Sequence, residues 1–462
     1  MSASRGAPPD RPPYSPTMNR RRFTRLTTLS AAGVWSHGLS GFTVLDGSRY
    51  PRQTPAVDSI RLGERMRTLA TFGANAAGGI DRVAFSDANI EARDWIARLL
   101  REAGFEPSTD FAGNLIARKA GSDAGLAPIM FGSHIDSVPG GGNFDGQVGS
   151  MGALEVATTL ADAGYTNQHP LEVAFFTNEE AGKTGSRALA GEVEAFELDL
   201  PTASGYTIGE GLRRMGGDPD RLGEATREPG SLAAFLELHV EQGAVLDQDG
   251  VDIGVVEGIV GIMRWNVTVE GMTNHAGTTP MDRRADAMVG AARLVTSVHQ
   301  IALALEGRHV ATVGRLVAEP GAPNVIPGRV TMSLEIRDLT MQRIEEVFDA
   351  IRERAHQLES ASGVTYSFER FYVSRAAPTD LRIRDIIEDA SDALGLSSQR
   401  MPSGAGHDAQ SIALLCPVGM IFVPSAAGIS HAPEEHTELE DIVNGSNVLL
   451  RTLLEIDRSG LE

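Results

Sequence analysis

The chain contains a single cysteine, Cys416, and this scarcity limits the chemistry available to its sites. No intrachain disulfide can form, and no set of thiolates is present to hold a metal ion. Zinc fingers built on cysteine are therefore excluded. Any metal site in this chain has to be made from histidine, aspartate and glutamate.

Positive charge is also scarce. There are 41 Lys and Arg against 61 Asp and Glu, so the formal net charge is −20. Nucleic acids and anionic membranes are bound by clustered positive potential, so we expect neither as a partner. After residue 50, no segment has the 18 uninterrupted apolar residues typical of a membrane-spanning helix. A small-molecule substrate is the expected partner.

The first 50 residues differ in composition from the rest. They begin with the Pro-rich SASRGAPPDRPPYSP, which we expect to be disordered, and continue with MNRRRFTRLTTLSAAGVW. Arg20, Arg21 and Phe23, followed by a weakly apolar stretch, resemble a twin-arginine signal that would export the folded protein to the periplasm. The alternative is a disordered basic tail on a cytoplasmic protein. Met18 is a second candidate for the first residue.

From residue 57 onward, strand and helix patterns alternate in a chain that is 42 % hydrophobic. NLIARKA, APIMFGSH and LEVAFFTNEE predict strands, whereas DANIEARDWIARLLREAG and QVGSMGALEVATTLADAG have apolar residues at helical spacing. This alternation predicts an α/β fold, a central sheet flanked by helices. In such sheets, ligands bind at the loops that follow the C-terminal ends of strands.

Residues 258–375 have a different order of predicted strands and helices from the rest of the chain. Strand and helix patterns follow one another there in the order βαββαβ, which is the ferredoxin-like arrangement. We therefore predict a small domain inserted into a larger one, whose two parts are residues 57–257 and 376–462. A chain of 462 residues is long enough to need more than one domain.

Two groups of polar residues follow apolar strands. In FGSHIDSVPGGGNFDG, His134 and Asp145 flank a run of three glycines, which is either an ordinary turn or a loop that passes close to a metal ion. Glu179 and Glu180 follow another strand. Adjacent carboxylates repel each other unless a cation or a proton resolves the conflict. A metal ligand beside a general base would resolve it.

These motifs, with LELHVEQG and GISHAPEEH, resemble a known family: the bimetallic amidohydrolases that comprise N-carbamoyl-L-amino-acid hydrolases, allantoate amidohydrolases and β-ureidopropionases, within the aminoacylase and carboxypeptidase superfamily. The resemblance extends from Asp58 to the C-terminus. It is also carried by TNHAGTTPMDRRADA, PNVIPG, LEIRD and SGAGHDA. It implies a zinc-exopeptidase-like catalytic domain with a central mixed sheet, and an inserted domain that acts as a lid and a dimerisation surface.

The resemblance also implies two divalent metal ions per subunit, either zinc or manganese or cobalt. His134 and His239 would bind one ion and Glu180 and His431 the other. Asp145 would bridge the two. These ligand types suit all three metals, so the native ion stays open.

Glu179 would be the general base that takes a proton from the attacking water and passes it to the leaving nitrogen. Asp136 would orient the imidazole of His134 by a hydrogen bond, or else simply cap the turn. The superfamily's peptidase branches usually have aspartate where this chain has His239, so the histidine, followed by the motif EQG, favours the carbamoylase branch.

The inserted domain would supply further residues. By resemblance, His275 reaches into the active site of the partner subunit of a homodimer and stabilises the oxyanion, and Arg337 clamps the substrate carboxylate. The alternatives are that His275 has only a structural role and that Arg337 is an outward-facing surface charge. Closure of the domain would then be part of turnover. The other residues implied to contact substrate are Gln242, Asn324, Gly406 and His407.

The leading hypothesis is a metal-dependent hydrolase of linear amide or ureido C–N bonds. Its substrate would be an N-carbamoyl-L-amino acid, with the amino acid, CO2 and ammonia as products. Allantoate hydrolysis would use the same groups and stays an alternative. An aminoacylase or dipeptidase is disfavoured by His239. An exported, non-catalytic metal- or ureide-binding protein is the alternative of a different class, and the presence of every implied ligand and of the base argues against it.

Overall fold

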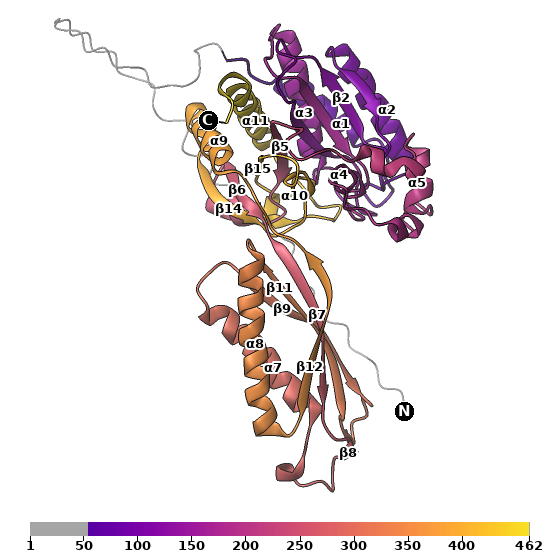
Figure 1. Cartoon of the computed structure of the whole chain (residues 1–462), viewed down its shortest axis with the longest axis vertical. Helices are drawn as coiled ribbons and strands as arrows, with labels where there is room; N and C mark the ends of the chain where they lie inside the picture. Colours follow the sequence, from indigo (N-terminus) through magenta and orange to yellow (C-terminus); the bar gives the residue numbers. More distant parts are fainter. Residues whose placement is uncertain (1–53, 462) are drawn as a thin grey trace, which may run out of the picture. The chain divides into compact units, whose positions relative to one another are not determined.

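The computed structural model describes residues 54–461 (Figure 1). The expected twin-arginine segment with Arg20, Arg21 and Phe23, and the alternative start at Met18, lie outside the described residues. Two larger sheets organise the described chain.

The larger sheet has nine strands in the order β1-β2-β4-β3-β5-β15-β6-β13, with β14 beside β6. Its four central strands, β4, β3, β5 and β15, are parallel. β2 runs antiparallel to both of its neighbours, whereas β6 is antiparallel to β15 and β13 but parallel to β14. The predicted central mixed sheet is therefore confirmed. The strands are β1 Glu106–Thr109, β2 Leu115–Lys119, β3 Ile129–His134, β4 Leu171–Phe176, β5 Ala234–Val240, β6 Ile253–Ile259, β13 Ala377–Pro378, β14 Ser398–Ser403 and β15 Val418–Val423.

Helices cover both faces of this sheet, which explains why its central strands are buried along their whole length. Alternate residues of β3 belong to different cores: Ile129 and Phe131 pack in one, Met130 in the other. The first core is closed by α1 Ser59–Leu69, α2 Asp87–Glu102, α3 Gln147–Asp162, α9 Leu381–Leu394 and α11 Leu439–Ser459. The second core is closed by shorter helices, which include α4 Thr184–Leu189, α6 Val245–Asp249 and α10 Ala409–Ile412.

The second sheet has four antiparallel strands in the order β12-β7-β11-β9. Its two helices, α7 and α8, lie on one of its faces, as Figure 1 shows. These elements follow the predicted βαββαβ order, and a two-stranded ladder of β8 and β10 accompanies them. The bounds are β7 Gly261–Glu270, β8 Asn274–His275, α7 Ala287–Ala304, β9 Val310–Glu319, β10 Val325–Ile326, β11 Arg329–Asp338, α8 Met341–Ser362 and β12 Thr365–Ser374.

Among the described residues, α7 is the one helix that is long and apolar enough to cross a membrane by length and composition. Its inner face packs in the core of the four-stranded sheet through Ala287, Ala291, Leu294 and Val298.

Candidate metal centre and active site

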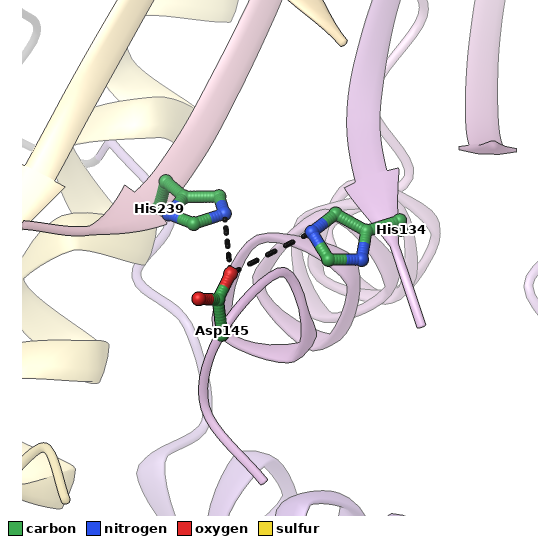
Figure 2. A group of neighbouring side chains, drawn as sticks. All are labelled: His134, Asp145 and His239. Atoms are coloured by element: carbon green, nitrogen blue, oxygen red, sulfur yellow. Dashed lines mark ion pairs between the residues drawn. The ribbon is translucent and has the colours of Figure 1, made fainter. Parts of the chain in front are cut away.

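Neighbouring strands bring two histidines together beside one aspartate (Figure 2). His134 is the last residue of β3 and His239 the last but one of β5, and these strands pair in parallel, so their C-terminal ends adjoin. Asp145 lies in the loop between β3 and α3. Its Oδ1 is 3.2 Å from His239 Nε2 and 3.7 Å from His134 Nε2. All three residues are buried.

The second carboxylate oxygen of Asp145 faces a different pair of residues. Its Oδ2 is 3.1 Å from Nε2 of His431, which is itself 3.4 Å from Oε2 of Glu180. Glu180 comes from the turn after β4, and His431 from the loop between β15 and α11. Asp145 thus lies between two groups of three donors, each close enough to hold one metal ion.

The two buried imidazoles are held in the orientation that metal binding needs. Nδ1 of His134 lies 3.1 Å from the main-chain oxygen of Asp136, and Nδ1 of His239 lies 2.9 Å from that of Val240. If each carbonyl accepts the Nδ1 proton, each Nε2 turns its lone pair toward Asp145. This donor set of neutral imidazoles and carboxylates fits zinc, manganese or cobalt.

The structure corrects one detail of the expectation for Asp136. Its carboxylate is 3.7 Å from the His134 ring, beyond hydrogen-bonding distance, so the ring's partner is the main-chain carbonyl. The carboxylate is turned toward the loop after β4. There it accepts hydrogen bonds from the main-chain N–H groups of Glu179, at 3.4 Å, and Glu180, at 3.2 Å. Asp136 therefore holds the turn that carries the two glutamates.

Crowded charges perturb the protonation of these residues. Burial would raise the pKa of Asp145, but hydrogen bonds from His239 and His431 outweigh it and hold that pKa well below its usual value. Burial, reinforced by the charge of Asp145, raises the pKa of Glu180 to about 8. The hydrogen bond to Asp145 raises the pKa of His431 to about 9. A divalent cation would relieve the repulsion between the carboxylates.

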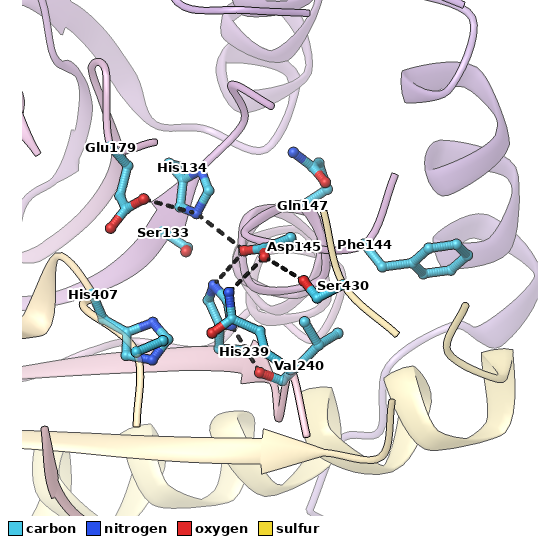
Figure 3. A network of polar contacts seen from close by, with 12 residues as sticks. Ser133, His134, Phe144, Asp145, Gln147, Glu179, His239, Val240, His407 and Ser430 are labelled. Carbon is cyan, nitrogen blue, oxygen red and sulfur yellow. Dashed lines mark hydrogen bonds and ion pairs between the residues drawn. The ribbon is translucent and has the colours of Figure 1, made fainter. Parts of the chain in front are cut away.

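Glu179 approaches the same centre without belonging to either donor group. Its Oε2 lies 3.8 Å from His134 Nε2, and Figure 3 shows its side chain pointing toward that imidazole. Burial raises its pKa above the usual value, although His134 and Lys183 oppose the shift. A raised pKa makes this carboxylate a stronger proton acceptor than an exposed glutamate.

Two of the expected substrate contacts also adjoin the cluster. Gln242 Nε2 donates to Asp145 Oδ2 at 2.6 Å, and its Oε1 is buried with no hydrogen-bond partner among the described residues. The His407 ring meets that of His239 edge-to-face at 4.5 Å, and its Nε2 lies 2.7 Å from Ser403 Oγ. Burial, with the nearby charge of His239, holds the pKa of His407 well below its usual value.

Arg337 connects the second sheet to the segment that carries Gly406 and His407. Its Nη1 donates to the carbonyl of Gly404 at 2.6 Å, while its Nε donates to Glu335 at 2.8 Å. The guanidinium is therefore neither a free charge nor purely outward-facing. Glu335 occupies part of the fork that a substrate carboxylate would use.

His275 and Asn324 lie together, but their contacts in the described chain are local ones. His275 pairs with Val325 in the β8-β10 ladder, and Asn324 accepts a hydrogen bond from Ala276 at 3.0 Å. His275 is exposed, and its Nδ1 accepts from the Gly277 N–H at 3.0 Å. Its expected role in a partner's active site remains a prediction.

Sequence reasoning missed several side chains near the cluster, among them Glu237, which forms a further donor group with His239 and His407, and two residues that contact Asp145. Ser430 Oγ lies 2.8 Å from Asp145 Oδ2, and the Glu435 carboxylate accepts a hydrogen bond from the Asp145 main chain at 2.9 Å. Both flank His431 in the motif GISHAPEEH. The available signal was a second acidic residue four positions after the histidine.

The sequence and structure are similar to those of known amidohydrolases. An N-carbamoyl-L-amino acid amidohydrolase of Geobacillus stearothermophilus is 39 % identical over 401 residues, covering 86 % of this chain and 98 % of that protein. A ureidoglycolate hydrolase of Arabidopsis thaliana is 34 % identical, with 90 % and 92 % covered. A hydantoinase/carbamoylase-family amidase of Burkholderia multivorans superposes with a TM-score of 0.80 at 36 % identity, covering 87 % of this chain and 98 % of that one.

A family match covers most of the described chain. The profile of peptidase family M20/M25/M40 matches residues 130–455, a span that includes all the residues of both donor groups. Together with relatives that align over nearly their whole length, this match confirms the predicted resemblance. The chain belongs to peptidase family M20/M25/M40.

Proposed function

We propose that the protein is a metal-dependent amidohydrolase that cleaves the ureido group from an N-carbamoyl-L-amino acid, releasing the amino acid, CO2 and ammonia. The observation that carries this proposal is the position of Asp145 between His134 and His239 on one side and Glu180 and His431 on the other. A carboxylate shared by two donor groups suits a two-metal hydrolytic site. Relatives 39 % and 37 % identical are N-carbamoyl-L-amino-acid amidohydrolases, which supports the reaction class.

In this proposal each donor group would hold one metal ion. His134 and His239 would bind one ion, Glu180 and His431 would bind the other, and Asp145 would contribute to both. Two bound divalent ions would polarise the scissile carbonyl and make the attacking water more acidic. Within this arrangement, the main-chain carbonyls of Asp136 and Val240 fix the histidine rings. The Asp136 carboxylate fixes the turn that presents Glu180.

Glu179 is the proposed general base. Because burial raises its pKa, it holds a proton more readily than an exposed glutamate does, which suits a group that takes a proton from water and then delivers it to the leaving nitrogen. Cleavage of the C–N bond would release the amino acid as the free amine and leave carbamate, which breaks down to ammonia and CO2. Glu179 lies at the centre without being needed in either donor group, so a ligand role and a base role can be separated by mutation.

Substrate recognition is proposed for the polar groups around the cluster. Arg337 would exchange its contact with Glu335 for the substrate carboxylate, which its planar fork can bind with two parallel hydrogen bonds. His275 would stabilise the oxyanion in the partner subunit of a homodimer, with closure of the inserted domain completing the site. The remaining proposed contacts are Gln242, Asn324, Gly406 and His407.

Hydrolysis of another ureide is the second candidate function. Relatives 34 % and 33 % identical are ureidoglycolate hydrolases, and such a substrate also carries a ureido group and a carboxylate. Allantoate shares both groups. The proposed ligands, base and arginine clamp would serve all these substrates alike.

The deciding experiment measures ammonia release by protein lacking residues 1–45, loaded in turn with zinc and manganese. The panel is N-carbamoyl-L-amino acids, N-carbamoyl-β-alanine, allantoate, ureidoglycolate and an N-acetyl amino acid, the last scored by amine release. Preference for N-carbamoyl-L-amino acids supports the proposal, and preference for allantoate or ureidoglycolate selects the second candidate. Turnover of the N-acetyl compound alone contradicts both. Metal binding without turnover of any compound indicates a binding protein.

A further inference from the structure

Glu435 connects the loop that carries Asp145 with the loop that carries His431. It lies between β15 and α11, and only 5 % of its surface is exposed. Its Oε1 accepts the main-chain N–H groups of Phe144 and Asp145, both at 2.9 Å. Its Oε2 accepts the main-chain N–H of His431 at 3.2 Å. One carboxylate therefore holds the backbone at both Asp145 and His431.

The hydroxyl of Ser430 adds a second connection between the same loops. Its Oγ lies 3.0 Å from Glu435 Oε2 and 2.8 Å from Asp145 Oδ2, and Figure 3 shows the serine beside that aspartate. Glu435 thus contacts the main chain of Asp145, and Ser430 contacts its side chain. The loop that carries His431 is tied to Asp145 at two points.

The loop of three glycines leaves room for this carboxylate. A Cβ added at Gly142 would lie 2.4 Å from the Cβ of Glu435 and 2.5 Å from its Oε1. Approaches this close are sterically forbidden, so a side chain at position 142 would push Glu435 away from its partners. The last glycine of the run therefore leaves the space that Glu435 occupies, although the two residues are far apart in sequence.

The hydrogen-bonding pattern requires an acceptor at both oxygens of Glu435. Three of its four partners are main-chain N–H groups, which can only donate, and they contact both oxygens. The fourth is the Ser430 hydroxyl, whose single proton can go to Glu435 or to Asp145. These bonds offset the cost of burying the charge. A glutamine at position 435 would have only one acceptor oxygen. Its NH2 group would face either the N–H groups of Phe144 and Asp145, or the N–H group of His431 and the hydroxyl of Ser430. In one of the two loops, a donor would therefore face a donor.

We propose that Glu435 is a positioning residue of the metal centre, which fixes Asp145 and His431 relative to each other without itself being a ligand. The proposal rests on the proposed function only in that the centre binds metal ions. Residues that orient ligands in this way contribute about 10- to 100-fold to metal affinity.

The test compares Glu435→Gln with the wild type in a metal-binding measurement that needs no substrate. Protein freed of metal by a chelator is titrated with zinc or cobalt in competition with a chromogenic chelator. We expect the affinity of Glu435→Gln to fall by about 10-fold or more. We also expect the visible absorption of its cobalt form to change. Glu434→Gln, at the exposed neighbouring position, is the matched control and should bind as the wild type does.

Two further variants keep the test decisive if Glu435→Gln does not fold. Gly142→Ala should displace Glu435 and reproduce the loss of affinity, and Ser430→Ala should weaken binding in the same direction. Folded Glu435→Gln with wild-type affinity would overturn the proposal, as would wild-type affinity in both other variants. Lower thermal stability of the metal-free protein with unchanged affinity would also overturn it, because it indicates a purely structural role. Failure of every ureide assay would leave these binding results intact.

Discussion

At the scale of single residues, the most informative contrast is between adjacent glutamates. Glu180 belongs to a donor group with Asp145 and His431, whereas Glu179 approaches from the side of His134. Their neighbouring positions in one turn give two carboxylates with different surroundings. The proposed division into ligand and base follows from those surroundings, because the two side chains are chemically identical.

Replacing Glu179 with Gln should separate these roles. The change removes the proton acceptor but keeps size and polarity, so we expect kcat to fall by about 100-fold or more while metal content per subunit stays near that of the wild type. Elemental analysis and steady-state kinetics on the same preparation check this. Glu180→Gln is the comparison and should lower metal content as well. Loss of metal from Glu179→Gln would contradict its assignment as the base.

The metal-free protein should lose stability as pH rises. Folded Glu180 holds its proton up to about pH 8, whereas the unfolded chain releases it near 4.5, so the folded state binds the extra proton between these values. His431, whose pKa is raised to about 9, adds stability that is complete below pH 6.5 and lost through about pH 9. Both effects have the same sign. Melting temperatures of chelator-treated protein should therefore fall between pH 6 and 9.

The matching control for this pH dependence is Glu180→Gln, which should reduce the slope. Metal-loaded wild type should also show a smaller slope, because bound metal requires the deprotonated carboxylate and the neutral imidazole at every pH. A melting temperature of the metal-free protein that rises or stays constant over this range would contradict the assignment of these protonation states.

At the scale of elements, helices are held to each other by charge as well as by apolar packing. Glu155 of α3 is fully buried and forms ion pairs with Arg61 and Arg65 of α1, at 2.6 and 2.7 Å. It also accepts the main-chain N–H of Asp58, the residue that caps α1. One side chain of α3 thus fixes both the start and the inner face of α1.

Glu155→Gln should therefore destabilise the fold markedly. Removing the carboxylate leaves the buried guanidinium of Arg65 without its counter-charge and takes one of two carboxylate partners from Arg61, so we expect a loss of about 3 kcal/mol in the free energy of unfolding. Urea denaturation followed by circular dichroism measures it. Asp162→Asn removes the exposed partner of the same Arg61 and should cost less than about 1 kcal/mol. Equal losses in the two variants would show that burial of Glu155 does not matter.

The sequence was most informative where a local pattern determines the structure. Alternating strands and helices predicted the central sheet, and polar residues at strand ends predicted that His134, Glu180 and their neighbours would meet at one edge. Glu435 could not be predicted in this way. Its partners Phe144 and Asp145 are about 290 residues away in sequence, and nothing in either motif states that the two loops touch. The direction of the Asp136 carboxylate was also missed. Both of its possible partners, the His134 ring and the main-chain N–H groups of Glu179 and Glu180, lie close to it in the folded protein.

At the scale of the whole molecule, the N-terminal segment remains a proposal. Arg20 and Arg21 resemble a twin-arginine signal, which transports proteins that have already folded. We expect Arg20→Lys combined with Arg21→Lys to retain the protein in the cytoplasm, as measured by fractionation of the producing cells. Arg11→Lys, outside the motif, is the control and should be exported normally. Equal distribution of the double variant and the wild type would contradict the proposal.

The place of the last strand has a consequence for how the protein is made. β15, although it comes near the end of the chain, lies between β5 and β6 inside the larger sheet. Until the ribosome has released this segment, β5 keeps an open edge with unpaired backbone groups. A chain that ends before this segment therefore lacks an interior strand of its sheet as well as His431. Translation that stops early should yield an aggregation-prone fragment, not an enzyme with reduced activity.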